Sequence, residues 1–107
     1  KSLNIPVICL PRGVKNYKNY CEIVKPDAIC IDYEVDPKKI LKEIKIPIQG
    51  GMDPKALLTD KENLKKEAKQ YLDLFKDHTY IFNLGHGVLP ETDPNMMDYL
   101  VKMVKNY

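Results

Sequence analysis

The sequence predicts an α/β protein in which short strands alternate with helices. Four short apolar runs are each followed by a polar stretch with helical spacing, and no low-complexity linker or domain boundary separates them. The apolar runs are residues 7–10, 28–31, 46–48 and 80–82. Repetition of strand and then helix implies parallel strands joined by right-handed crossovers.

The apolar runs have the composition of parallel strands. The first, second and fourth lack an alternation of apolar and polar residues, as expected for strands covered on both faces. Pro47 weakens the third run, because proline cannot donate a ladder hydrogen bond, although proline is tolerated at the start of a strand.

Helical spacing marks the stretches between these runs. One apolar stripe comprises Tyr17, Tyr20, Cys21 and Val24, a second comprises Leu64, Ala68, Tyr71, Leu72 and Phe75, and a third comprises Met97, Leu100, Val101 and Val104. Thr59 and Glu62 match a capping box, which predicts a helix over residues 60–77. We expect the last helix to begin at Thr92 or Asp93, with Pro94 in its first turn.

Two architectures fit this order of elements. One is a small doubly wound sheet, and the other is half of an eight-stranded TIM barrel, because four units in 107 residues match the ~30 residues per unit of such a barrel. In both, a ligand site forms where the strands end.

Composition excludes several classes of function. Seventeen Lys and Arg against 15 Asp and Glu give a net charge of only +2, which argues against a nucleic-acid partner. Apolar runs of about four residues are too short to cross a membrane. Cys9, Cys21 and Cys30 form no Cys-x-x-Cys pair, which indicates reduced thiols and a cytoplasmic location. Because the chain starts at Lys1 rather than Met, we expect it to be a piece of a longer protein.

The segment Asn83-Leu84-Gly85-His86-Gly87 carries the strongest indication of a site. It follows an apolar run, and its glycines allow backbone to approach a ligand while one imidazole points at it, although His86 could equally be an ordinary turn residue. Zinc-protease, P-loop, serine-hydrolase and dinucleotide-binding motifs are absent from the sequence. His86 is therefore the side chain at the expected rim that is suited to proton transfer near neutral pH.

Arg12 and Asp32, near the ends of the first two strands, have two interpretations each. Arg12 is the only arginine, and its planar fork suits a substrate carboxylate, but it could instead pair with Asp32. Asp32 could be that structural partner or an acceptor for loop amides. Asp53-Pro54 and Asp93-Pro94 have the form of helix starts, and we expect His78 to be a surface or C-cap residue.

The longer motifs resemble a known family. IQGGMDPKALLTDKE and YIFNLGHGVLPETDP are similar to the closing part of the uroporphyrinogen decarboxylases, and PRGVKNY and IDYEVDP resemble the preceding strand-end segments. The resemblance covers residues 5–105. It implies that residues 1–107 are the C-terminal half, about four βα units, of a single TIM (β/α)8 barrel domain.

That resemblance also implies an activity. The family decarboxylates the four acetate side chains of uroporphyrinogen III to give coproporphyrinogen III in haem biosynthesis, as a homodimer and without metal or organic cofactor. His86 falls on the family's active-site histidine, and we place Arg12, Asn83, Gly85 and Gly87 with it as substrate-binding residues. The family's other principal residues, which include an arginine-rich segment and an aspartate, belong to the N-terminal half.

Departures from the family leave alternatives open. Many relatives have QGNLDP where this chain has QGGMDP, and Tyr33 stands where tryptophan is frequent. Corrinoid-linked methyltransferases share the fold but bind zinc through histidine and cysteines, and no cysteine of this sequence is close to His86. A non-catalytic half-barrel that pairs with a partner is the third interpretation, and alone the segment is expected to be inactive and to associate.

Overall fold

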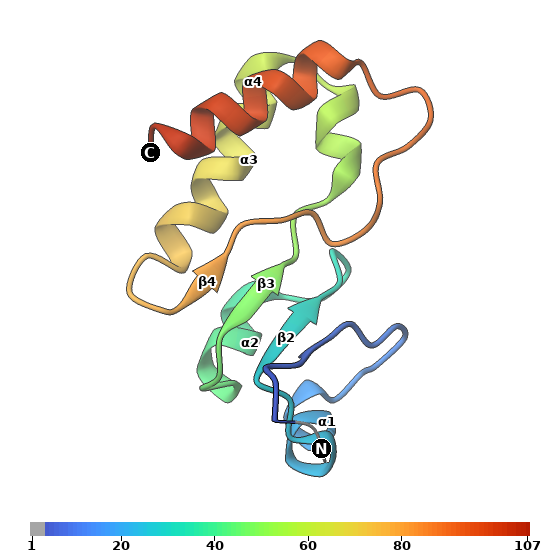
Figure 1. The fold of residues 1–107 in the computed structure, drawn as a ribbon. Coiled ribbons are helices and arrows are strands. Elements are labelled where there is room, and N and C mark those ends of the chain that lie inside the picture. The colour runs from blue at the N-terminus through green and yellow to red at the C-terminus, as the bar shows by residue number, and fades with distance from the viewer. Residues whose placement is uncertain (1–3) are drawn as a thin grey trace.

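Parallel strands form the centre of the structure, a computed structural model that describes residues 4–107. Within that range the sheet has the order β1-β2-β3-β4, and neighbouring strands are parallel (Figure 1). The strands are β1 Ile8–Cys9, β2 Ala28–Ile31, β3 Ile48–Gly50 and β4 Tyr80–Ile81. The helices are α1 Tyr17–Val24, α2 Pro37–Glu43, the 3-10 helix η1 Pro54–Leu58, α3 Lys61–Leu74 and α4 Pro94–Lys105. The prediction of an α/β fold with a parallel sheet is confirmed.

The third strand begins two residues later than predicted. Proline has no N–H to give to the ladder, so Pro47 contributes only its carbonyl, which accepts from the Ile29 N–H at 3.0 Å. The first residue of β3 that can both donate and accept is Ile48, whose N–H donates to the Thr79 carbonyl at 3.1 Å. The strand then continues to Gly50 and carries the chain to the rim.

Helices cover one face of the sheet and form two apolar clusters. The first cluster lies between the sheet and the helices and consists of Tyr17, Ile29, Ile31, Ile40, Ile44, Ile48 and Phe75. The second joins η1, α3 and α4 and consists of Met52, Ala56, Leu57, Leu64, Ala68 and Leu100. Most residues of the predicted stripes therefore face these clusters, but Leu72 of α3 belongs to neither cluster, and Val24 at the end of α1 and Val101 on α4 are exposed. Burial of this apolar area is the main stabilising contribution to the fold.

The other face of the sheet is partly uncovered in the described chain. Ile8 and Ile81 keep 49% and 45% of their surface exposed, and they pair in register with Ala28 and Gln49. Only β2 is buried along its whole length among these strands. The prediction that the first and fourth strands are covered on both faces is therefore wrong for the residues described, because their outer positions find no packing partner there.

Short side chains fix where the helices begin. Asp53 and Asp93 each accept from the N–H two residues on, at 2.9 Å, with proline in the first turn, as predicted. Asp36 before Pro37 does the same at 3.0 Å and was not anticipated.

The capping box predicted at Thr59 is wrong. Asp60 is the N-cap of α3 and accepts from the Asn63 N–H at 2.8 Å. The Thr59 hydroxyl instead donates to the Ala56 carbonyl at 2.6 Å and closes η1, the short helix that begins at the predicted Asp53-Pro54 start. The helix also ends earlier than predicted, at Leu74 rather than Asp77.

None of the helices in the described range has the length and apolar character needed to traverse a bilayer.

Candidate functional site

The turns that follow the four strands meet at one end of the sheet, because parallel strands all point the same way. The chain that leaves β4 then crosses over the ends of β3 and β2 (Figure 1). A parallel bridge pairs Met52 with Leu84, and the Gly85 N–H donates to the Met52 carbonyl at 2.7 Å. This crossing carries residues 85–87 from the edge strand toward the β1 side of the sheet.

Gly85 is where the crossing segment touches the turn after β2. Gly85 is buried, and a Cβ added to it would lie 2.3 Å from the Tyr33 backbone nitrogen. Only glycine permits so close an approach between two backbones. At Gly87, by contrast, an added Cβ would meet nothing within 4 Å. Gly85 therefore holds the loop in place, and Gly87 borders open space.

Arg12 and His86 are in direct contact although 74 positions separate them in sequence. Arg12 Nη1 lies 2.7 Å from His86 Nε2, and both side chains are exposed. Arg12 therefore contacts His86 and does not pair with Asp32, which was the alternative from the sequence. The Asp32 carboxylate accepts from the Tyr33 N–H at 2.7 Å, in agreement with its interpretation as an acceptor for loop amides.

Tyr33 flanks the imidazole on another side. The Tyr33 and His86 rings are 6.4 Å apart between centroids at an interplanar angle of 83°, an edge-on contact. The sequence already placed Tyr33 at this rim, because it comes directly after Asp32 at a strand end. It gave no indication that the ring would lie beside His86.

Asn83 lies apart from this pair. Its side-chain oxygen accepts from the Leu84 N–H at 2.8 Å, and the residue lines an apolar hollow of about 280 Å³ with Phe82, Met97 and Val101. A second hollow of about 320 Å³ opens between the turns after β1 and β2, where Gly13, Lys15, Asp32 and Glu34 line it. The rim therefore has free space on the β1 side, next to Arg12.

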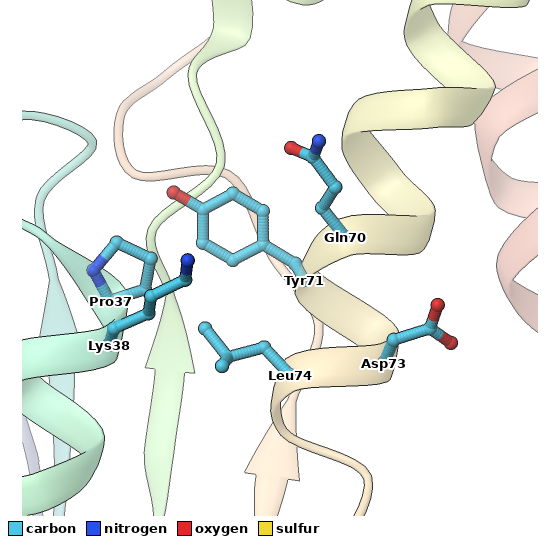
Figure 2. Close-up of a pocket in the computed structure, with 6 residues that line it drawn as sticks. All are labelled: Pro37, Lys38, Gln70, Tyr71, Asp73 and Leu74. Atoms are coloured by element: carbon cyan, nitrogen blue, oxygen red, sulfur yellow. The ribbon is translucent and has the colours of Figure 1, made fainter.

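A larger cavity, about 620 Å³, lies elsewhere, between α2 and α3. In Figure 2, Tyr71 and Leu74 of α3 point toward Pro37 and Lys38 of α2, and the Asp73 carboxylate points away. The Tyr71 hydroxyl donates to the Gly51 carbonyl at 2.8 Å. Burial raises the Tyr71 pKa, and the nearby carboxylates of Glu67, Asp53 and Asp36 raise it further. Because the Tyr71 hydroxyl keeps its proton and donates it to a backbone carbonyl, we interpret it as a structural hydrogen-bond donor. We therefore place the candidate site at Arg12 and His86 rather than in this larger cavity.

The three cysteines of the described residues are free thiols and are not part of a metal site. Cys9 and Cys30 lie in strands, as predicted, and Cys30 Sγ accepts from Gln49 Nε2 at 3.0 Å. Burial raises the pKa of the Cys21 and Cys30 thiols. Among residues 4–107 no group of three or more His, Cys, Asp or Glu side chains is arranged to hold a metal ion. His78, expected to be a surface or C-cap residue, is half-buried, and its Nε2 lies 2.9 Å from the Ile46 carbonyl.

Comparison with known proteins gives one consistent answer. The family model described as "Uroporphyrinogen decarboxylase (URO-D)" matches residues 1–107. Uroporphyrinogen decarboxylases of Wolbachia sp. subsp. Drosophila simulans and of Wolbachia pipientis are each 45% identical over 105 residues, and that of Rickettsia bellii is 39% identical over 106 residues. Each match covers 97% of this chain and 31% of the relative, so the chain spans about a third of the length of these curated relatives. The chain belongs to the uroporphyrinogen decarboxylase family.

Proposed function

We propose that this chain is part of a uroporphyrinogen decarboxylase, a carboxy-lyase that converts the four acetate side chains of uroporphyrinogen III to the methyl groups of coproporphyrinogen III. The observation that carries the proposal is the Arg12–His86 contact at the strand-end rim of a chain that belongs to this family. A cation and an imidazole 2.7 Å apart, both exposed, are suited to a substrate rich in carboxylates.

We further propose that residues 1–107 form the C-terminal half of a single TIM-barrel domain. Three features support this. The half-exposed apolar side chains of Ile8 and Ile81 lie on the sheet face that a closed barrel would bury, and β1 and β4 each have a free edge in the described chain. The relatives are about three times as long, which leaves enough polypeptide for the other four units.

Decarboxylation of an acetate side chain on a pyrrole needs an electron sink. Loss of CO2 leaves a carbanion-like centre next to the ring, and protonation of that pyrrole draws the electron pair into the ring. Proton delivery to the exocyclic carbon completes the methyl group, and loss of the proton taken up by the ring restores the pyrrole. Orientation of the carboxylate and a suitable electrostatic environment supply the catalysis.

Within that scheme His86 and Arg12 have distinct roles. His86 hydrogen-bonds a substrate carboxylate or assists protonation of the pyrrole, since its ring is exposed on the rim. Arg12 adds positive charge beside it and binds a carboxylate through its guanidinium. Gly85 positions the loop, and Gly87 borders open space.

The remaining properties follow from membership of the family. We propose that the complete enzyme acts without metal or organic cofactor, functions as a homodimer and works in the cytoplasm on a tetrapyrrole substrate. The residues described here contain only part of the active site, so we propose that this segment alone is inactive.

The test is an assay of the complete gene product on uroporphyrinogen. His86→Asn and His86→Ala are each expected to lower kcat/KM at least threefold, which corresponds to about 0.7 kcal/mol of transition-state stabilisation. Arg12→Lys keeps the charge but loses the fork, so KM is expected to rise. His78→Gln, a histidine outside the rim, serves as the matched control and is expected to leave kcat/KM within threefold.

Three results would contradict the assignment. A complete protein with no decarboxylase activity would favour the non-catalytic half-barrel, and unchanged kinetics in both His86 variants would remove the histidine from the mechanism. Stoichiometric zinc in the complete protein, found by metal analysis, would favour the methyltransferase alternative.

A further inference from the structure

The contact between Arg12 and His86 indicates which nitrogen of the imidazole carries the proton. A guanidinium carries only N–H donors and stays charged in proteins, so His86 Nε2, at 2.7 Å from Arg12 Nη1, must accept. A ring nitrogen that accepts has no proton. In this geometry a neutral imidazole carries its proton on Nδ1.

The second ring nitrogen agrees with this assignment. His86 Nδ1 lies 3.4 Å from the Gly87 carbonyl oxygen, a long contact in which the carbonyl can only accept. A neutral imidazole in water prefers to carry its proton on Nε2. The Arg12 contact thus favours the form that is less populated in a free histidine.

We propose that Arg12 is a positioning residue for His86, whose guanidinium holds the imidazole in the neutral Nδ1–H tautomer with the Nε2 lone pair turned to the Arg12 side of the rim. The catalytic meaning of this inference depends on the proposed function. The tautomer itself does not, because it is a property of the chain without substrate.

The surroundings keep both partners in place. Tyr33 touches the imidazole edge-on, and Gly85 fixes the loop against the Tyr33 backbone nitrogen. A flip of the ring would put carbon atoms where Nε2 and Nδ1 now meet Arg12 and Gly87. The Arg12 N–H groups that do not meet His86 stay free for a carboxylate ligand, so the imidazole in turn orients the fork.

His78 provides an internal reference. Its Nε2 lies 2.9 Å from the Ile46 carbonyl, which can only accept, so Nε2 must carry the proton when that ring is neutral. The two histidines of this chain are therefore expected in opposite tautomers. A single spectrum can report both.

The experiment is NMR of the complete gene product labelled with ¹⁵N in the histidine rings, at a pH of about 8.5, where an ordinary imidazole is neutral. The signals are assigned from their loss in His86→Gln and His78→Gln. We expect Nδ1–H for His86 and Nε2–H for His78. Arg12→Met, which removes every donor, is expected to move His86 to the Nε2–H form and leave His78 unchanged.

The wild-type spectrum alone decides the matter if Arg12→Met does not fold. His86 found as Nε2–H in the wild type, or still as Nδ1–H in a folded Arg12→Met variant, would overturn the inference. Lys15→Met, at a neighbouring cation of the same turn, is the matched control, and a change of the His86 tautomer there would also overturn it. No substrate is present, so a failure of the decarboxylase assay is a separate result.

Discussion

At the scale of single residues, Gly85 determines where His86 can lie. The glycine sits against the backbone of the turn after β2, and the next residue in the chain is the histidine that reaches Arg12. His86 is itself exposed, so little of its own burial holds it there. The position of the imidazole depends on the close fit of the residue before it.

Replacement of Gly85 is expected to disturb the site. In Gly85→Ala the new Cβ would lie 2.3 Å from the Tyr33 nitrogen, and because that atom belongs to the backbone the loop must move. We expect a loss of about 1–3 kcal/mol in the free energy of unfolding and a lower kcat/KM for the complete enzyme. Urea unfolding and the uroporphyrinogen assay measure the two effects.

Gly87→Ala is the matched control for this change. Its Cβ would meet nothing within 4 Å, so the free energy of unfolding is expected to stay within about 0.5 kcal/mol of wild type. Equal losses in both variants would show that the contact with Tyr33 does not hold the loop.

At the scale of elements, short polar side chains set the helix starts. Asp60 is the N-cap of α3, the longest helix, and its carboxylate accepts from the Asn63 N–H. Asp60→Ala is expected to destabilise the protein by about 1 kcal/mol in urea unfolding. Asp60→Asn, which can still accept that hydrogen bond, should retain most of the stability. A loss in the asparagine variant as large as in the alanine variant would contradict the capping role.

The tyrosine of β4 joins its strand to the neighbouring one. The Tyr80 hydroxyl donates to the Gly50 carbonyl at 2.6 Å, and the ring stacks on Phe75 with centroids 4.3 Å apart. Burial raises the Tyr80 pKa well above its usual value, and the neighbouring Tyr71 raises it further. In the folded protein the phenol therefore keeps its proton at pH values where an unfolded tyrosine loses it.

This raised pKa predicts a loss of stability in alkali. The contribution of Tyr80 is fully present below the unfolded tyrosine pKa of about 10 and is lost as the pH rises toward the folded value, because the folded state then binds more protons than the unfolded state. Urea unfolding at pH 8, 10 and 11 should show stability falling above about pH 10. Tyr80→Phe, which has no ionisable group there, is expected to fall less steeply. Equal slopes would contradict the prediction.

At the scale of the whole molecule, the sheet lacks cover on one side. Within residues 4–107, β1 and β4 each have a free edge, and Ile8, Leu10 and Ile81 are about half exposed. Unpaired strand edges beside apolar surface are sites of association. This side of the molecule is where we propose that the rest of the barrel packs.

The 107-residue chain produced alone is therefore expected to self-associate, and two copies could close a barrel-like sheet. Sedimentation velocity is the measurement. Ile81→Lys should shift the chain toward monomer, because it puts a charge on the uncovered face. Ile23→Lys, at a position 71% exposed on α1, should not. A monodisperse wild-type monomer would contradict the prediction.

The sequence by itself determined the alternation of strands and helices, the buried second strand, the apolar stripes and the Asp-Pro helix starts. These features depend on local periodicity and on hydrogen bonds between residues two to four positions apart, so a single segment contains the information. The motifs of the fourth turn were also enough to indicate the family that the comparisons then gave.

Tertiary structure alone decided the contacts between residues far apart in the sequence. From the sequence, Arg12 could pair with Asp32 or bind a ligand. The loop after β4 crosses over β3 and β2 and brings His86 into contact with Arg12 instead. Ile8 and Ile81 stay half exposed, because the described chain places nothing over that face of the sheet. Each outcome depends on where residues distant in sequence come to lie, and local pattern does not encode those distances.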